Sequence, residues 1–386
     1  MSKDVDVIVV GAGPAGSTAA AVLAQRGLQV LLLDREQFPR PKPCGDVVPL
    51  GSFVELDKIG LRAFDNNRFN IHQIVLQGEE TTGRKFSLAQ QQALSTCVVS
   101  RASFDQAIFE YALACGAEFR AVSVKGPILA GPQVVGVSGT AGRRDVQLRS
   151  SIVIGADGAT SAIARALGGP ARQDSQWAVA IRGYIDTDTE LDNTIELAFL
   201  DHLQPGYAWF FPMARHRANV GVGMRTDFYK RQHRSLRDLL AGYLALPQNA
   251  RRIGRNRVEE AQSWPVPLFR FEKQRVFDGA LLAGDAGGFV HPITAAGIYP
   301  AIITGKCAAE AALHALAAGD LSQAGLARYD VLWHEALAAD FKPAVTASKL
   351  STVFPHLVSA ALLLSKAKEE LPGGAETSFP FASGKF

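Results

Sequence analysis

The chain has 386 residues, of which 47% are apolar and 20% are charged, and this length accommodates two domains or one large domain with insertions. Its net charge is only +3, and no dense basic run of the kind that follows a phosphate backbone is present, which argues against nucleic acid as a partner. The four cysteines, Cys44, Cys97, Cys115 and Cys307, lack C-x-x-C spacing, which argues against a metal site or a disulfide framework and favours a reducing cytoplasm.

The N-terminal stretch carries the most informative pattern in the chain. An apolar strand predicted for Val5 to Val10 leads directly into the glycine turn Gly11 to Gly16, which reads G-A-G-P-A-G. A helix predicted for Ser17 to Gln25 follows, and a second apolar strand, Leu28 to Leu33, ends on Asp34. We do not expect a signal peptide here, because the apolar run has no basic leader and is needed as the first strand. The order of strand, turn, helix, strand and acid is that of the dinucleotide-binding fingerprint.

Each residue type in this turn has a mechanical reason. Gly11 allows a tight turn, Gly13 lets the backbone approach a pyrophosphate, and Gly16 lets helix and sheet pack closely. The helix N-terminus offers unpaired N–H groups to phosphates, and Asp34 is placed to accept hydrogen bonds from a ribose. We therefore predict a dinucleotide site that includes Gly11, Gly13, Ala15, Gly16, Asp34 and Arg35.

The loop from Phe38 to Asp46 is dense in residues that break regular structure. It reads F-P-R-P-K-P-C-G-D, with three prolines and one glycine. Such a stiff segment beside a cofactor-binding strand favours a role in the site over that of a plain surface connection.

The next part of the chain alternates between sheet and helix patterns. Short alternating strands are predicted between Asn70 and Val99, and a helix from Arg101 to Ala114. Strands around Ala121 to Val124, Val134 to Val137 and Asp145 to Leu148 form a hairpin-like unit. The strand Ser151 to Ile154 then enters a turn, Gly155 to Ser161, and a short helix.

A run of antiparallel strands interrupts this pattern. The strands predicted are Trp177 to Tyr184, Thr194 to Leu200, Tyr207 to Pro212 and Ala218 to Met224, with one helix from Ser235 to Leu246. The stretch Leu281 to Gly288 returns to the strand–glycine–helix style of the beginning. Helices are predicted from Ala296 to Ala317 and from Gln323 into the Leu360s.

Three separated elements resemble the two-domain FAD-dependent oxidoreductases built like the aromatic hydroxylases. The first is the glycine fingerprint Gly11 to Gly16. The second resembles the D-G motif of that family, here Gly155 to Ser161 with Asp157 and Gly158, and the third resembles its G-D motif, here Gly284 and Asp285. The order and spacing agree across almost the whole chain, which implies FAD as the cofactor.

The resemblance and the patterns together predict the fold class. We expect an α/β FAD-binding Rossmann-like domain that is discontinuous in sequence, formed by residues 1–70, 98–172 and 275–330. An antiparallel-sheet α+β substrate domain, residues 71–97 and 173–274, is inserted into it, and residues 331–386 form a C-terminal helical segment.

The same resemblance implies roles for further residues. Asp285 would hold a ribityl hydroxyl of the flavin, and the helix that begins near Thr294 would point its positive end at the flavin ring. Arg101 stands where the R-x-x-F-D arginine of the family contacts the cofactor. The cofactor site that this implies adds Cys44, Gly45, Arg101, Ser123, Asp157, Gly158, Gly284, Asp285, Gly297 and Ile298 to the residues named above.

Two further segments resemble the geranylgeranyl reductase branch of this family. Arg40 to Gly45 is similar to its R-x-K-x-C-G stretch, and Tyr207 to Pro212 to its Y-x-W-x-F-P motif. The period of a strand places Tyr207, Trp209 and Phe211 on one face, which the branch uses as the wall of a long apolar pocket. The alternative reading of this face is an ordinary aromatic core stripe. The resemblance implies pocket-lining catalytic candidates at Cys44, Tyr207 and Trp209.

The chain departs from the branch at several places, among them Gln204, where the branch has a proline, and Pro300, which is unusual inside the helix predicted from Ala296 to Ala317. The branch has C-G-G where this chain has Cys44-Gly45-Asp46. The family reads P-x-T-G-E-G-I after the G-D motif, and here Ala295 and Ala296 replace the glycine and the glutamate. These changes leave the FAD prediction intact and leave the substrate open.

The leading hypothesis is a flavoenzyme that reduces carbon–carbon double bonds of an apolar, prenyl- or lipid-like substrate with hydride from FADH2. A flavin-dependent monooxygenase or halogenase of the same fold is the first alternative, and an electron-transfer flavoprotein component is one of another class. NAD(P)H as a transient electron donor, a redox partner protein and a peripheral membrane contact are further expectations. Tyr207 and Phe211 stand where the W-x-W-x-I-P motif of halogenases has Trp and Ile, which argues against halogenation.

Overall fold

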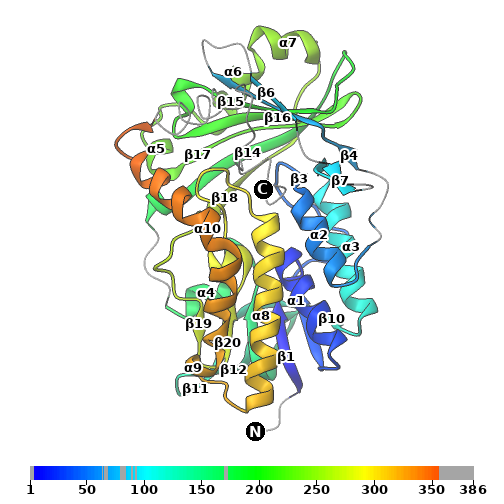
Figure 1. Ribbon diagram of the computed structural model, residues 1–386, viewed down its shortest axis with the longest axis vertical. Coiled ribbons are helices and arrows are strands. Elements are labelled where there is room, and N and C mark those ends of the chain that lie inside the picture. The colour runs from blue at the N-terminus through cyan, green and yellow to red at the C-terminus, as the bar shows by residue number, and fades with distance from the viewer. Residues whose placement is uncertain are drawn as a thin grey trace, which may run out of the picture.

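A computed structural model describes residues 4–62, 64, 68–78, 84–87, 90, 91, 94–168 and 173–355. The molecule is elongated and has two lobes (Figure 1). Long helices and a largely parallel sheet form the lobe that contains the N-terminus, and a second sheet with short helices forms the other lobe. Residues 356–386, which include the end of the predicted C-terminal helical segment, lie outside the described residues.

The first lobe is built on a parallel sheet. β1 (Val5–Val10) lies between β2 (Val30–Asp34) and β13 (Arg144–Gly155), and pairs with both in parallel. β10 (Glu118–Ala121) extends the sheet beyond β2, and β20 (Ala280–Leu282) pairs in parallel with β13. The near-continuous apolar sequence of β1 and β2 fits this position, because strands of a parallel sheet are covered on both faces.

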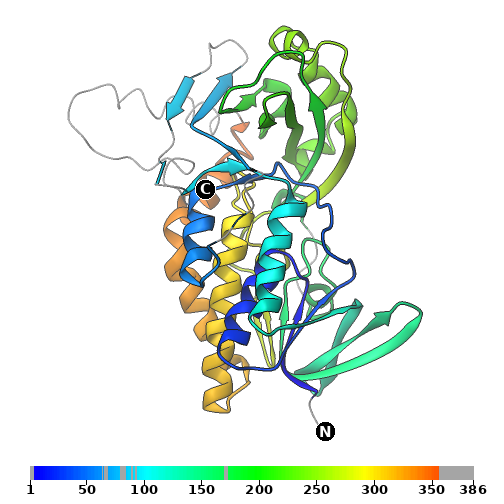
Figure 2. The ribbon, with the colours of Figure 1, turned by 90° about the vertical axis from the view of Figure 1, so that its right-hand side faces the viewer.

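Helices cover one face of this sheet and a β-hairpin extends from it. α1 (Pro14–Gln25) packs against α3 (Arg101–Ala114) and against α8 (Ile298–Ala318), and α10 (Arg328–Leu350) packs against α8. Beyond β13 the sheet continues with the antiparallel strands β12 (Gln133–Ala141) and β11 (Ser123–Ala130), which project from the lobe in Figure 2. α1 and α8 approach closely because Gly305 has no side chain, since a Cβ atom there would lie 2.3 Å from the carbonyl oxygen of Ala15.

The second lobe contains a seven-stranded sheet. Its order is β18 (Glu259–Pro267), β14 (Trp177–Asp186), β17 (Arg217–Arg225), β16 (Gly206–Ala214), β15 (Thr194–Phe199), β5 (Gln73–Gly78) and β6 (Arg84–Ser87). All neighbouring pairs are antiparallel except β15 and β5, so the sheet is mixed where the sequence predicted antiparallel strands. One face packs on α6 (Leu236–Leu244), and the other faces the first lobe.

Short elements complete the described structure. They are β3 (Val47–Val48), α2 (Leu50–Lys58), β4 (Phe69–Asn70), β7 (Gln90–Gln91), β8 (Leu94–Ser95), β9 (Cys97–Val98), α4 (Ala162–Ala166), α5 (Thr226–Tyr229), α7 (Pro247–Ile253), β19 (Val276–Phe277), α9 (Gln323–Leu326) and the 3₁₀ turns Asp174–Gln176, Asp201–Leu203 and Gly284–Gly287.

Several predicted boundaries move in the structure. α1 begins at Pro14 rather than Ser17, because a proline fits the first helical position, where its missing N–H costs nothing. The single helix predicted from Gln323 is two helices, α9 and α10. α8 is long and apolar enough to cross a membrane by length and composition, yet 61% of its most apolar window is buried within the protein, as in a core helix.

Candidate functional site

A cavity of about 1050 Å³ lies between the two lobes. Its wall begins at the loop after β1, follows the segment from Arg40 to Gly45, and ends at the face of the seven-stranded sheet. It therefore joins a glycine-rich backbone surface to an aromatic side-chain surface.

The glycine turn forms the first end of the cavity. Gly11 has a φ of +98°, and a Cβ atom there would lie 2.3 Å from the carbonyl oxygen of Ala156, the residue that follows the neighbouring strand β13. A Cβ atom at Gly16 would lie 1.8 Å from the carbonyl oxygen of Gly11. No described side chain caps the N-terminus of α1 at Gly13, so its N–H groups remain available to an anion.

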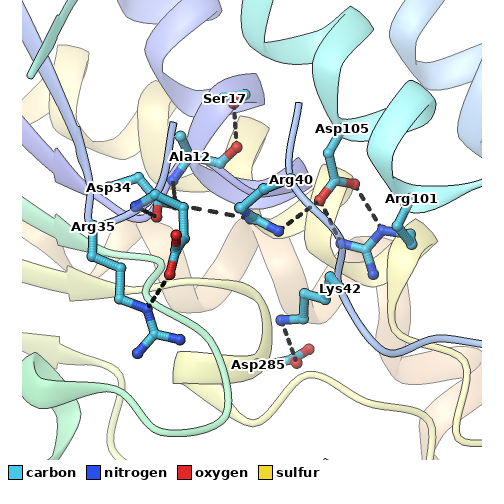
Figure 3. A network of polar contacts seen from close by, with 10 residues as sticks. Ala12, Ser17, Asp34, Arg35, Arg40, Lys42, Arg101, Asp105 and Asp285 are labelled. Carbon is cyan, nitrogen blue, oxygen red and sulfur yellow. Dashed lines mark hydrogen bonds and ion pairs between the residues drawn. The ribbon is translucent and has the colours of Figure 1, made fainter. Parts of the chain in front are cut away.

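Asp34 lies at this end and already takes part in the turn. Its carboxylate accepts a hydrogen bond from the backbone N–H of Ala12 at 2.9 Å (Figure 3). It also accepts one from the backbone N–H of Glu36 at 3.0 Å. Each oxygen can accept a further bond, so a ribose can still be held there. Arg35 is exposed and pairs with Glu36 at 3.5 Å.

Arg40 is a functional candidate that the sequence analysis quoted within a motif but did not select. Its guanidinium lies 3.8 Å from Asp34 and 3.5 Å from Asp105, and it stacks 4.8 Å from the ring centre of Phe38. A Cβ atom at Gly13 would lie 3.5 Å from Arg40. This positive charge therefore stands beside the turn where a pyrophosphate would bind.

Arg101 and Asp105 form a buried ion pair on the first turn of α3. Arg101 donates two hydrogen bonds to the carboxylate, at 2.7 and 2.8 Å, and Asp105 is fully buried. The fork geometry compensates part of the cost of burying both charges. Arg101 also interacts with Cys44, where it lowers the pKa of the thiol, although burial dominates and raises that pKa above its usual value. Cys44 is accordingly a protonated thiol at neutral pH.

Asp157 and Asp285 occupy different environments. Asp157 accepts hydrogen bonds from Ser161 at 2.5 Å and from the backbone N–H of Ala162 at 2.7 Å, so it fixes the start of α4 as well as lining the cavity. Asp285 follows β20 and lies 3.8 Å from Lys42, whose pKa is lowered by burial (Figure 3). Lys42 is a second cation that the sequence analysis did not select.

The residues before α8 form the wall opposite Asp285. A Cβ atom at Gly297 would lie 3.4 Å from an oxygen of Asp285, and no described side chain caps the start of α8. Gly284, Gly297 and Ile298 line the cavity, as do Ser123 on β11 and Gly158 after β13. The positive end of α8 is thus open to the cavity beside a carboxylate.

The aromatic strand forms the second end. Tyr207, Trp209 and Phe211 lie on one face of β16 with ring centres 6.0 Å apart, and all three line the cavity. The Tyr207 hydroxyl donates to the carbonyl oxygen of Thr294 at 2.5 Å, which joins the two lobes. Gly45 lies under Phe211, since a Cβ atom there would be 3.0 Å from its ring.

A buried polar network supports this face. Trp209 donates to the side-chain oxygen of Asn219 at 2.9 Å, and the amide of Asn219 donates to the carbonyl oxygen of Cys44 at 2.7 Å. Asn219 and the Tyr184 hydroxyl both donate to Asp46, each at 2.8 Å. Burial raises the pKa of Asp46 to about 6. The network ties the cysteine loop to the sheet.

The backbone at Asp46 explains one departure from the family motif. Asp46 has a φ of +64°, in the left-handed region that glycine occupies without cost. The branch places a glycine at this position, whereas this chain has a fully buried carboxylate. A non-glycine residue held there points to a function for the side chain.

These features fit FAD. Gly11 and Gly16 keep the turn tight, because side chains there would collide with backbone carbonyl oxygens, and Gly13 leaves open space beside Arg40 for a pyrophosphate. Two helix N-termini, those of α1 and α8, face the same cavity. Arg40 and Lys42 supply positive charge to phosphates between them. The adenosine end would lie at Asp34 and the flavin end between Cys44 and Gly297.

Comparisons with known proteins agree with this fit. A family model described as an FAD binding domain matches residues 4–336. The chain is 30% identical to a digeranylgeranylglycerophospholipid reductase from Methanocella arvoryzae, over 87% of this chain and 84% of that protein. It is 31% identical to a menaquinone reductase from Mycolicibacterium smegmatis, over 80% of this chain and 76% of that protein.

Solved structures share the fold. A geranylgeranyl bacteriochlorophyll reductase-like protein from Thermoplasma acidophilum has a TM-score of 0.81 at 23% identity, covering 95% of this chain and 98% of its own. Flavin-dependent halogenases also share the fold, among them one solved with FAD. With its FAD cradle and its likeness to named reductases, the chain belongs to the FAD-binding-domain family, as an FAD-dependent oxidoreductase of the geranylgeranyl reductase branch.

Proposed function

We propose that this protein reduces carbon–carbon double bonds in an apolar substrate that carries a prenyl chain. The observation that supports this most is the continuity of the cavity, which runs from the glycine turn to the aromatic face of β16. Apolar walls with a few placed polar groups are typical of sites for such ligands. The relatives named as reductases of digeranylgeranylglycerophospholipid and of menaquinone support the same substrate class.

FAD, when bound and reduced, supplies the hydride, and the protein supplies position, dryness and a proton. Trp209 and Phe211 are nearly buried and exclude water from the flavin end. Cys44 lies at this end with its proton retained, because burial raises the pKa of the thiol. We assign it the role of holding a proton near the reacting carbon, with water as the other source.

Two experiments test this function. The purified protein should show the visible spectrum of FAD, lose it on anaerobic reduction with NADPH, and regain it when a prenylated substrate is added. Hydrogenation of the substrate is checked by mass spectrometry. A protein that cannot be reconstituted with FAD would contradict the cofactor assignment, and a flavin that no prenylated compound reoxidises would contradict the reaction.

Two substitutions separate the cofactor from the substrate. Asp285→Ala should weaken FAD retention, because a cavity carboxylate beside Lys42 is lost. Trp209→Ala should spare FAD and impair turnover, because it removes the aromatic wall. Turnover that is unchanged in Trp209→Ala would show that β16 does not line the substrate pocket.

A flavin-dependent monooxygenase or halogenase is the second candidate, favoured by solved halogenases of the same fold. Tyr207 and Phe211 argue against halogenation, because the W-x-W-x-I-P motif of halogenases has Trp and Ile at these two positions. Oxygen consumption decides between the two: a reduced enzyme that reacts slowly with oxygen and quickly with a prenylated compound is a reductase.

The electron source and the cellular location are part of the same proposal. We propose NAD(P)H or a redox partner protein as the donor, since FAD must be reduced before each turnover. A pure electron-transfer role predicts reduction by such a partner and no turnover of any small molecule.

We also propose that the protein is located in the cytoplasm, which is consistent with its four cysteines being free of disulfide bonds.

A peripheral membrane contact is proposed at the end of α10. Leu350, Val353 and Phe354 are exposed there, with exposed fractions of 46%, 70% and 58%. Ser348 and Ser351, their neighbours in sequence, line the cavity. If the end of α10 contacts a membrane, a lipid-like substrate could pass from that membrane into the cavity beside Ser348 and Ser351. Vesicle flotation with Val353→Asp/Phe354→Asp tests it, with reduced flotation as the expected result.

A further inference from the structure

The cavity wall contains buried hydrogen-bond donors to which no described residue offers an acceptor. Nε and Nη1 of Arg182, the side-chain amide of Gln204 and the indole N–H of Trp264 are buried without a partner among the described residues. All three side chains line the cavity. Buried donors left without an acceptor are costly, so a ligand that brings acceptors gains binding energy here.

Arg182 is the charged member of this group, and only 3% of it is exposed. It lies on β14 with its guanidinium 4.5 Å from the ring centre of Tyr184. Four other arginines of the cavity wall have carboxylate partners: Arg35 pairs with Glu36, Arg40 with Asp34 and Asp105, Arg101 with Asp105, and Arg225 with Asp227. The Nε and Nη1 atoms of Arg182, by contrast, have no hydrogen-bond partner among the described residues.

The position of Arg182 places it beside the aromatic wall. In the register of the sheet, Arg182 is opposite Gly221 on β17, and Gly221 is opposite Trp209 on β16. The indole of Trp209 lies over Gly221, where a Cβ atom would be 2.1 Å from the ring. Arg182 is therefore the next polar group along the wall from Trp209.

The local charge favours a neutral ligand group. Arg182 acts electrostatically on the carboxylate of Asp46, whose second oxygen is also buried without a partner. Tyr184 and Asn219 donate to the other oxygen. Arg101 also acts on Asp46, but its guanidinium is already paired with the buried Asp105. A phosphate at Arg182 would be repelled by the Asp46 carboxylate, whereas a neutral carbonyl oxygen would not.

We propose that Arg182 forms a polar subsite that binds a neutral carbonyl oxygen on the head group of the prenylated substrate. The proposal rests on the proposed function, because it places that head group at Trp209 on the same cavity wall. Arg182 thereby sets substrate preference: compounds with an oxygen acceptor next to the prenyl chain bind better than the bare chain.

The test uses Arg182→Met, which keeps side-chain length and removes all donors, and Arg182→Lys, which keeps the charge. The probes are a geranylgeranyl-substituted naphthoquinone, geranylgeranyl phosphate and a geranylgeranyl hydrocarbon. Binding to the oxidised FAD enzyme is followed by the change in flavin absorbance, and turnover by KM and kcat separately. FAD affinity of each variant is measured first.

Arg182→Met should weaken binding of the naphthoquinone about 10- to 100-fold, as expected when a hydrogen bond to a charged group is lost. KM should rise by a similar factor, with FAD affinity and hydrocarbon binding unchanged. Arg182→Lys should recover part of the loss. Arg217→Met is the matched control, since Arg217 also stacks on Tyr184, at 5.6 Å, yet pairs with Asp186 and Glu259 outside the cavity.

The outcomes are separable from those for the proposed function. Equal binding of the naphthoquinone by the wild-type protein and Arg182→Met overturns the subsite, as does loss of FAD in that variant. An Arg182-dependent preference for the phosphate overturns the assignment to a neutral acceptor. Arg182-dependent binding of the naphthoquinone without reduction of any probe supports the subsite and contradicts the reductase.

Discussion

The two ends of the cavity are built in different ways. The end at Gly11 to Asp34 is a backbone surface made by one continuous stretch of chain. Its glycines allow close backbone approach, and the uncapped N–H groups at the start of α1 can bind an anion. The end at Cys44 and Trp209 is a side-chain surface, assembled from a loop and several strands of another sheet. If FAD binds at the first end and the proposed substrate at the second, FAD binding would depend on shape at single positions, and substrate choice on a network that several residues share.

The largest effect is expected when one methyl group is added to the glycine turn. Gly11→Ala should lose FAD and about 5 kcal/mol of stability, because its Cβ atom would lie 2.3 Å from a carbonyl oxygen at a φ of +98°. FAD content and urea unfolding measure both losses.

Gly27→Ala provides the control. Gly27 also has a positive φ, +79°, but nothing lies within 4 Å of the added Cβ atom. Only the backbone cost of about 1 kcal/mol is expected, with FAD retained. If both variants behave alike, strain rather than the close approach to Ala156 explains Gly11.

The ion pair between the two ends should show the next largest effect. Arg101→Met leaves the buried Asp105 without its bidentate partner, with Arg40 3.5 Å away and Lys42 nearby, and should cost about 3 to 5 kcal/mol in thermal or urea unfolding. The double variant Arg101→Met/Asp105→Leu should recover most of this. No recovery would mean that Arg101 acts through packing and not through its charge.

Asp46 gives the side-chain end a pH dependence. Its pKa in the folded state is about 6, above the unfolded value, so the folded protein binds the proton more tightly. Stability from this group is present at acidic pH and is lost as pH rises from about 4 to about 6. The loss is on the order of 2 to 3 kcal/mol.

Asp46→Asn removes this titration and can still accept both hydrogen bonds that Tyr184 and Asn219 donate. The free energy of unfolding of Asp46→Asn minus that of the wild-type protein should therefore be larger above about pH 6 than at pH 4. Urea unfolding with saturating FAD across this range checks the sign. A difference that does not vary with pH would mean that Asp46 does not titrate there.

The smallest effect is expected at the contact between the lobes. Tyr207→Phe removes the hydrogen bond to Thr294 and should cost about 1 kcal/mol. Tyr243→Phe is the matched control, because the buried Tyr243 hydroxyl lies near Asn249 without a hydrogen bond of normal length and angle, and its loss should be neutral or stabilising. If both variants lose the same free energy of unfolding, the hydrogen bond from Tyr207 to Thr294 does not stabilise the contact between the lobes.

The same contrast explains what could be predicted from the sequence. The strands, glycine turn and helix of the backbone end follow local rules, and all appear in the structure within a few residues of their predicted bounds. The common face of Tyr207, Trp209 and Phe211 followed from strand period. Arg40 and Lys42 were visible inside a motif, but their role depends on the distances to Asp34 and Asp285.

Arg182 and Asn219 carry no sequence signal. Each is one polar residue in an alternating strand, and its importance arises only when β14 and β17 are aligned above Cys44. The departure at Asp46 was visible in the sequence, but its positive φ and its partners were not, because Tyr184 and Asn219 lie far away in the chain. The mixed character of the sheet was missed because β5 lies far from β15 in the sequence.

That pairing of β5 with β15 also governs the order in which the protein can assemble during synthesis. Gln73 is paired with Thr194, and Val10 with Gly155, so both sheets contain strands that must wait for distant partners to leave the ribosome. Until then β5 presents a free strand edge, which is a site for aggregation. The strands that flank the glycine turn, β1 and β13, are both complete once residue 155 has been synthesised, before β15 and β16 of the aromatic wall have been made.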